Sequence, residues 1–138
     1  MGNRWIDSKE ALEHNRLVQY SDWRTIRYSD RSVQKWIATV PKGAVILEYA
    51  IQTITTFNSG GTDLFTLGIY GDDDLYINDL DISAFAATSP TTMTRAVVNV
   101  RMAADTDVYG MYADGNTSAT EGEMRVAIMW APWAEQGT

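Results

Sequence analysis

Cysteine is absent from this chain of 138 residues, so disulfide bonds, thiolate metal ligands and a cysteine nucleophile are all excluded. Histidine occurs once, as His14, in a polar stretch near the N-terminus. A single histidine without cysteine cannot build a usual zinc site, and no Gly-x-Ser-x-Gly motif accompanies it as in a serine hydrolase. We therefore expect His14 to be a surface residue, and we expect the protein to hold no metal and no cofactor.

Long apolar runs are also missing. No stretch approaches the ~20 apolar residues that a helix needs to cross a bilayer. The opening sequence MGNRWIDSKE contains no apolar core of the kind that secretory leaders carry. We therefore expect no secretory leader and no membrane contact. We also expect synthesis in a reducing cytoplasm, with which the absence of cysteine agrees.

Basic residues are scarce in most of the chain, whose formal net charge is −7. Residues 1–43 carry eight Lys or Arg against five Asp or Glu, a balance of +3. Residues 44–138 carry three Arg against thirteen acids, a balance of −10. An acidic body repels phosphate, so we expect no binding to nucleic acid. The basic segment could dock on an acidic surface, although an ordinary mixed-charge surface would give the same count.

Short β-favouring segments are abundant. The longest, residues 44–56, has no Gly, Pro, Asn or Asp and is rich in Val, Ile, Thr and Tyr. Alternation places Val45, Leu47, Tyr49 and Ile51 on one face, which we expect to be buried. Further strands are expected at residues 33–40, 64–70, 93–102, 106–113 and 123–130, and residues 58–62 are expected to turn the chain so that 64–70 forms a hairpin with 44–56.

The last of these segments shows the clearest alternation. Met124, Val126, Ile128 and Trp130 recur at every second position, and Pro132 ends the run. We expect these four side chains to point into the core. Residues 75–88, in contrast, have mixed periodicity and are expected to form a loop with a short strand or a single helical turn.

Strands separated by turns, without a long amphipathic helix, indicate an all-β fold, namely an antiparallel β-sandwich. A jelly roll is the preferred version, because two facing sheets suit long strands with one strongly apolar face. We divide the chain into an N-terminal arm or peripheral segment, residues 1–30, and a β-sandwich domain, residues 31–138. Residues 7–10 resemble a capping box, so a short helix is expected in the arm.

Acidic side chains offer the only other candidate chemistry. One group comprises Asp72, Asp73, Asp74, Asn78, Asp79 and Asp81. Such a group can bind a hard cation or form a solvated turn, and both interpretations stay open, although the spacing lacks the EF-hand pattern. Glu121 and Glu123 lie two residues apart, and Glu123 alternates with core positions, so we interpret it as exposed rather than catalytic. Without a paired acid, base or nucleophile, we expect no enzyme activity.

Five Trp and seven Tyr make a high aromatic load. Exposed aromatic side chains on a jelly roll can form a platform for sugars, but core packing and subunit contacts use the same residues. Trp130 belongs to an expected core face. The remaining tryptophans are Trp5, Trp23, Trp36 and Trp133. They lie nearer the chain ends, where subunit contacts and ligands both remain possible roles.

Four stretches in order carry a family resemblance: VPKGAVI at 40–46, TTFNSGGT at 55–62, LGIYGDDDLY at 67–76 and SATEGEMRV at 118–126. This series resembles small virion structural proteins of tailed bacteriophages, in which a Pro-(Lys/Ala)-Gly-Ala-(Val/Ile)-Ile entry precedes a Thr-(Ala/Thr)-Phe-Asn turn. The resemblance covers about residues 33–130 and departs from the pattern slightly at 63–65 and 120–122. It implies a capsid decoration (cement) protein, often trimeric, or a part of head or tail fibres.

The resemblance leads to three hypotheses. In the first, the chain is a decoration protein on the outer surface of a phage head, with the major capsid protein and other copies of itself, as a homotrimer, for partners. In the second, it is a tail or head-fibre component, and in the third a carbohydrate-binding β-sandwich module. The residues expected to contact the capsid or a neighbouring subunit are the arginines and aromatics interleaved in the arm: Arg4, Trp5, Arg16, Tyr20, Trp23, Arg24, Arg27 and Tyr28.

Overall fold

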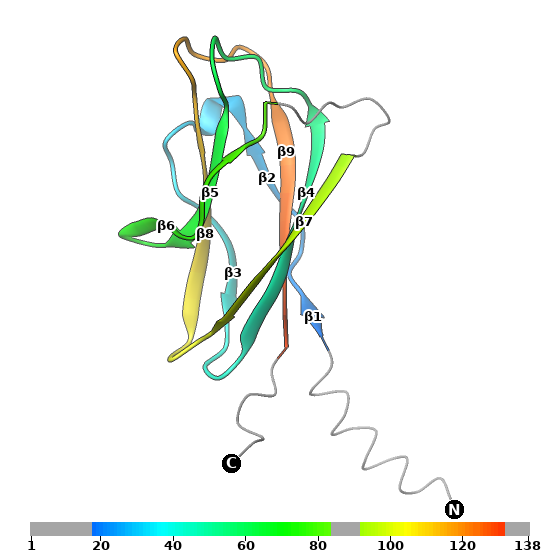
Figure 1. Cartoon of the computed structure of the whole chain (residues 1–138), viewed down its shortest axis with the longest axis vertical. Coiled ribbons are helices and arrows are strands. Elements are labelled where there is room, and N and C mark those ends of the chain that lie inside the picture. Colours follow the sequence, from blue (N-terminus) through cyan, green and yellow to red (C-terminus); the bar gives the residue numbers. More distant parts are fainter. Residues whose placement is uncertain (1–17, 84–91, 132–138) are drawn as a thin grey trace, which may run out of the picture.

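A computed structural model describes residues 18–83 and 92–131, and it describes the side chains of these residues except those of 92–100. The described chain forms two antiparallel sheets that face each other (Figure 1). Its elements are β1 (Gln19–Tyr20), β2 (Arg24–Arg27), the 3-10 helix η1 (Tyr28–Asp30), β3 (Lys35–Val40), β4 (Val45–Thr55), β5 (Leu64–Ile69), β6 (Asp72–Asp81), β7 (Thr92–Arg101), β8 (Thr106–Ala113) and β9 (Glu123–Ala131). The predicted antiparallel β-sandwich is confirmed.

The strand order is nested. Sheet A, as we name the first sheet, has the order β1-β9-β4-β7, and β2 also pairs with β9; sheet B has the order β3-β8-β5-β6. If β1 and β2 are taken as one interrupted edge strand, the first strand pairs with the last, the second with the second last, and so on inward to the β5–β6 pair. This nesting is the topology of a jelly roll.

The core lies between the two sheets and is built from buried apolar residues that both sheets contribute. Met124, Val126 and Ile128 on β9 are at most 1% exposed, as the alternation of that segment predicts. Trp130 is partly buried and packs against the same core. The facing sheet contributes Phe65 and other fully buried apolar residues. The predicted orientation of the last strand is therefore confirmed.

The alternation predicted for β4 is right in only half of the strand. Tyr49 and Ile51 are buried as expected, but the fully buried residue at the start of the strand is Ile46, and Val45 and Leu47 are only partly buried. The pairing of β4 with both neighbours shifts between Ile46 and Glu48. Such a β-bulge adds one residue and reverses the alternation, so the faces exchange at this point.

The predicted hairpin between residues 44–56 and 64–70 is wrong. The two strands β4 and β5 lie in different sheets, and the chain between them crosses the end of the sandwich. There the Asn58 side chain accepts hydrogen bonds from the backbone N–H groups of Thr120 and Glu121. Each of the two strands has one strongly apolar face. Pairing them side by side in one sheet would not bring these two faces into contact. Facing each other across the core buries both faces.

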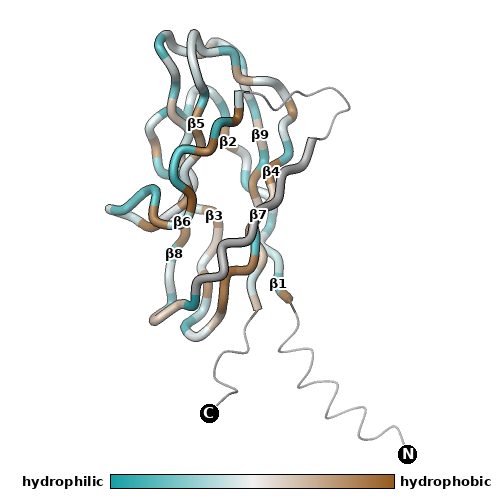
Figure 2. The backbone as a smooth tube through the Cα atoms, in the orientation of Figure 1, coloured by the Kyte–Doolittle hydropathy of each residue, from teal (hydrophilic) through white to brown (hydrophobic). Residues whose placement is uncertain are grey.

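Most of residues 75–88 was expected to be loop, but residues 72–81 form the long strand β6. The pairing with β5 is irregular: residues 73–76 oppose the single residue Gly68, because Leu67 pairs with Ile77 and Ile69 with Asp72. These residues make the projection at the side of the sandwich in Figure 1, and its hydrophilic part is teal in Figure 2. The bulged pairing explains why the sequence shows no simple period here.

Part of the segment assigned to an arm belongs to the sandwich. Both β1 and β2 pair with β9, and Ile26 on β2 is 0% exposed in the core. Residues 1–17, where the short helix was expected, lie outside the described residues. The prediction of an arm is therefore restricted to residues 1–17. In the part of the chain that the structure describes, no helix is long and apolar enough to cross a membrane.

Candidate interaction surfaces

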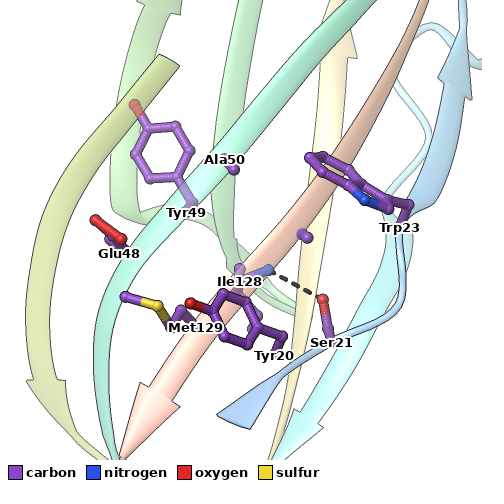
Figure 3. Close-up of a pocket in the computed structure, with 9 residues that line it drawn as sticks. Tyr20, Ser21, Trp23, Glu48, Tyr49, Ala50, Ile128 and Met129 are labelled. Carbon is purple, nitrogen blue, oxygen red and sulfur yellow. Dashed lines mark hydrogen bonds between the residues drawn. The ribbon is translucent and has the colours of Figure 1, made fainter. Parts of the chain in front are cut away.

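A groove lies on the outer face of sheet A, where the edge strand is interrupted. Residues 21–23 oppose only two residues of β9, because Tyr20 pairs with Met129 and Arg24 with Val126. Ser21 maintains the contact across this bulge: its hydroxyl accepts a hydrogen bond from Ile128 N at 3.0 Å, the dashed line in Figure 3. This hydrogen bond ties the interrupted edge strand to β9 at Ser21, between the side chains of Tyr20 and Trp23.

The groove has a floor of small residues and aromatic walls. Ala50 and Ala127, which pair in register, form the floor. Tyr20 and Trp23 stand on either side, with exposed fractions of 65% and 39% (Figure 3). The enclosed volume is about 230 Å³, and the complete lining is Tyr20, Ser21, Trp23, Glu48, Tyr49, Ala50, Ala127, Ile128 and Met129.

The Trp23 wall is held in place by a cation. The guanidinium carbon of Arg125 lies 5.5 Å from the centre of the Trp23 ring, which is within the range of a cation–π contact. Arg125 in turn donates a hydrogen bond to the side-chain oxygen of Gln52, its register partner on β4. A preorganised apolar groove of this size fits one bulky side chain of a protein partner.

The other described residues of the predicted contact set have structural roles. Arg24 donates a hydrogen bond to Ile37 O at 3.0 Å and thereby joins β2 to β3 of the other sheet. Tyr28 packs against the core. Arg27 forms a 3.9 Å ion pair with Glu123 at the surface. The structure thus brings Tyr20 and Trp23 together at one groove and separates Arg24 and Tyr28 from it. Arg4, Trp5 and Arg16 lie outside the described residues, so their role stays a prediction.

A hollow on the outer face of sheet B was not predicted. It lies between the residues that precede β3 and the turn from β5 to β6, with Tyr109 and Met111 of β8 between them. Its volume is about 570 Å³, and its lining is Ser32, Val33, Gln34, Tyr70, Gly71, Asp73, Tyr109 and Met111. The sequence contains one indication of it. Asp107 lies on the outward-facing side of β8, and Tyr109 and Met111, at every second position after it, lie on the same side.

The acidic group of residues 72–81 is spread along the irregular strand β6. Asp81 accepts hydrogen bonds from the backbone and the hydroxyl of Ser83, which lower its pKa. At the other end, partial desolvation, the hydrogen bond with Asp74 and the charges of Asp74 and Asp73 raise the pKa of Asp72. In residues 18–83 and 92–131, no three acidic or histidine side chains converge in a way that could hold a metal ion.

A polar cluster is buried at the end of the sandwich where the loops β4–β5 and β8–β9 meet. The hydroxyl of Tyr112 lies 2.6 Å from a carboxylate oxygen of Asp63 and 2.6 Å from one of Asp114. Arg31 forms a 2.5 Å ion pair with Asp114 and donates a second hydrogen bond to Ala119 O. Asp63 is 1% exposed, and within the described residues its second oxygen has no partner.

The electrostatics of this cluster fit a structural role. Burial, the hydrogen bonds to Asp114 and Asp63 and the charges of these carboxylates raise the pKa of Tyr112 far above its ordinary value. Burial alone would raise the pKa of Asp114. Hydrogen bonds from Tyr112, Arg31 and the backbone of Ala119, with the charge of Arg31, outweigh burial and hold it below its ordinary value. The cluster therefore keeps Tyr112 neutral and Asp114 charged, and it ties the two loops together.

No family model and no curated protein sequence matches the chain. Among solved structures, one similar chain belongs to the capsid asymmetric unit of cyanophage Pam1, with a TM-score of 0.59 and 18% identity over 83% of this chain and 84% of that one. Another belongs to the acid-stable capsid structure of Helicobacter pylori bacteriophage KHP30, with a TM-score of 0.63 and 12% identity over 83% of this chain and 87% of that one. The fold is one that phage capsids contain.

Proposed function

We propose that the chain is a structural protein of a bacteriophage virion, and specifically a decoration (cement) protein on the outer surface of the head. The observation that carries this proposal is the fold that it shares with chains of two phage capsid structures, over 83% of its length in each case. The coverage of the two matched chains is 84% and 87%, so both are about as long as this one. The series of phage-like sequence motifs supports the same conclusion.

In this role the protein would act mechanically rather than chemically. It would bridge neighbouring capsomers of the major capsid protein, and the area buried at the contacts would resist the outward pressure of packaged DNA. The groove between Tyr20 and Trp23 is suited to receive an apolar side chain of the shell. The arginines and Trp5 in residues 1–17 would add contacts of the kind that carry interface energy.

A homotrimer is the proposed oligomeric state. Large aromatic side chains are exposed on both outer faces of the sandwich, and among the described residues they include Tyr20 and Trp23 on one face and Trp36 and Tyr70 on the other. Exposed aromatic surface of this extent is typical of contact surfaces rather than of a monomer. A closed symmetric ring would bury part of it without leaving an open, growing contact.

The first experiment counts copies. Quantitative mass spectrometry of purified particles should find this protein in hundreds of copies per virion, as a decoration protein requires. A few copies per virion would instead assign it to the tail or a fibre, and absence from the particle would overturn a virion role altogether.

The second experiment tests attachment. Deletion of residues 1–17 leaves every described strand intact, whereas deletion to residue 30 would also remove β2 and the core residue Ile26. The shortened protein and Trp23→Ala should each bind undecorated shells more weakly than the full chain, while Leu75→Ala, an exposed residue on β6, serves as control. Binding should weaken as salt rises, because exposed charges are screened beyond ~8 Å at physiological ionic strength. Full occupancy by the shortened protein would contradict the role given to this segment.

A further inference from the structure

The hollow on sheet B has the volume of a small-molecule site. Its volume of about 570 Å³ lies within the range of roughly 300–1,000 Å³ that ligand sites occupy. It lies on the outer face of sheet B, and the groove between Tyr20 and Trp23 lies on the outer face of sheet A. A ligand bound in the hollow would therefore leave the groove free for a protein partner.

Two tyrosines give the hollow its apolar surface. The ring centres of Tyr70 and Tyr109 are 6.3 Å apart, and the ring planes are inclined at 60° to each other. Tyr70 is 80% exposed, the largest fraction among the exposed large hydrophobic residues of the described chain. Trp36 pairs with Tyr109 in register and is 43% exposed, so it extends the aromatic surface along the sheet. Aromatic faces of this kind pack against the C–H faces of sugar rings.

Polar groups surround these rings. Three polar residues, Asp73, Ser32 and Gln34, line the same hollow. Gln34 is held in position because its side-chain nitrogen donates a hydrogen bond to Ile69 O at 2.9 Å. A carboxylate accepts hydrogen bonds, while a hydroxyl both donates and accepts, which matches the hydroxyl groups of a sugar. The combination of few, fixed polar groups with an apolar wall is typical of specific ligand sites.

The backbone conformation places Asp73 at the side of the hollow. Residues 73–76 bulge over Gly68, where a Cβ atom would lie 2.2 Å from the carbonyl oxygen of Asp72 and 2.8 Å from that of Asp73. Glycine at position 68 therefore permits the close approach that brings the bulge onto the outer face of β5. The position of the Asp73 backbone beside the hollow therefore follows from the fold.

The charge of the bulge limits the class of ligand. Asp72, Asp73 and Asp74 follow one another, and the ion pairs Arg27–Glu123, Arg31–Asp114 and Lys35–Asp30 of the described residues do not involve them. Their combined negative potential would repel sulfated, sialylated or uronic-acid sugars. We propose that the hollow formed by Tyr70, Tyr109, Asp73 and Gln34 is a binding site for neutral hexose units of a polysaccharide. This inference does not depend on the proposed decoration function, because the site would exist wherever the protein is located.

The test is a titration of the full chain with neutral and acidic oligosaccharides. Binding is detected by changes in NMR chemical shifts and by calorimetry. The neutral probes are linear hexamers of glucose, galactose, mannose and N-acetylglucosamine, and the acidic probe is a hexamer of galacturonic acid. At least one neutral hexamer should bind, the acidic one should not, and the shifts should concentrate at residues 32–34, 70–73 and 109–111. Tyr70→Ala and Asp73→Ala should each weaken binding roughly tenfold or more.

Controls separate this site from the rest of the surface. Trp23→Ala changes an aromatic residue of the opposite face and should leave sugar binding unchanged. The melting temperatures of Tyr70→Ala and Asp73→Ala should match that of the wild type, since Tyr70 is largely exposed and Asp73 lies at the surface of the projection. Failure of all four neutral hexamers to bind would overturn the proposal. So would binding that Tyr70→Ala leaves intact, or selective binding of a Lys-rich or Arg-rich peptide in place of the sugars.

Discussion

The guanidinium carbon of Arg24 lies 4.5 Å from the centre of the Trp36 ring, and the two side chains come from opposite sheets. Arg24 belongs to β2 at the edge of sheet A, and Trp36 belongs to β3 at the edge of sheet B. The hydrogen bond from Arg24 to the carbonyl oxygen of Ile37 reinforces this link. One arginine therefore links the edge strand of sheet A to the edge strand of sheet B.

Replacing Arg24 should lower the stability of the fold. Arg24→Ala removes both the cation–π contact and the hydrogen bond, and we expect a loss of about 1–3 kcal/mol in the free energy of unfolding. Arg27→Ala is the matched control, since its exposed ion pair should be worth no more than about 1 kcal/mol. Urea unfolding monitored by tryptophan fluorescence measures both. Equal effects of the two variants would contradict the role of Arg24 as a link between the sheets.

A charge on the inner face of β9 should unfold the protein. Ile128 is 1% exposed between the two sheets, so Ile128→Asp would bury an unpaired carboxylate at a cost of several kcal/mol. Leu75→Asp introduces the same charge at a residue that is 49% exposed and should change stability little. Circular dichroism during heating distinguishes the two. A soluble Ile128→Asp protein with the wild-type melting temperature would show that the assigned orientation of β9 is wrong.

The hydroxyl of Tyr112 should be important for stability even though the ring alone fills the core. Tyr112→Phe keeps the ring but removes the hydroxyl that lies 2.6 Å from both Asp63 and Asp114, which leaves the buried Asp63 oxygen without this partner. We expect a loss of about 1–3 kcal/mol. Tyr70→Phe makes the same chemical change at an exposed site and should cost almost nothing. Chemical denaturation of the two variants gives the comparison, and an equally stable Tyr112→Phe would refute this assignment.

Stability should fall on acidification because of Asp114. Its pKa is lower in the folded protein than in the unfolded chain, so the unfolded chain binds more protons at low pH. The stabilisation is fully present above the unfolded pKa of about 3.9 and is lost as pH falls through the lower folded value. Melting temperatures measured between neutral pH and this acidic range should show the decline. Asp114→Asn should be less stable at neutral pH and should show a weaker decline, and an unchanged decline would contradict the assignment.

The sequence was most informative where strands are regular. Met124, Val126 and Ile128 follow simple alternation, and their burial could be predicted because β9 lies within sheet A and pairs regularly with β4 over these residues. The face of β4 was predicted only beyond Glu48, since a bulge leaves no mark in the pattern of apolar residues. β6 was missed for the same reason. Bulges depend on how two strands meet, and one strand's sequence does not contain that information.

The structure gives the predicted contact residues different surroundings, and their contact with a partner stays a prediction. Tyr20 and Trp23 were predicted as contact residues from their type and position, and the structure places them at the same groove. Arg24 and Tyr28 have the same residue types but pack within the sandwich, because β2 completes the sheet. The hollow with Tyr70 was predictable only in part: alternation in β8 marks Tyr109 and Met111 as outward-facing, but the rest of the lining comes from separate parts of the chain that only the strand order brings together.

The nested strand order also determines when the protein can fold during synthesis. The last of the described strands, β9, lies between β4 and the two strands described first, β1 and β2, so sheet A cannot be completed until residues 123–131 have left the ribosome. Until then one edge of β4 carries unpaired backbone groups that another nascent chain could pair with. Folding is therefore a late event that involves the whole chain, and its long-range pairings make it slow. A host that translates many copies at once would have to keep these unfinished chains apart.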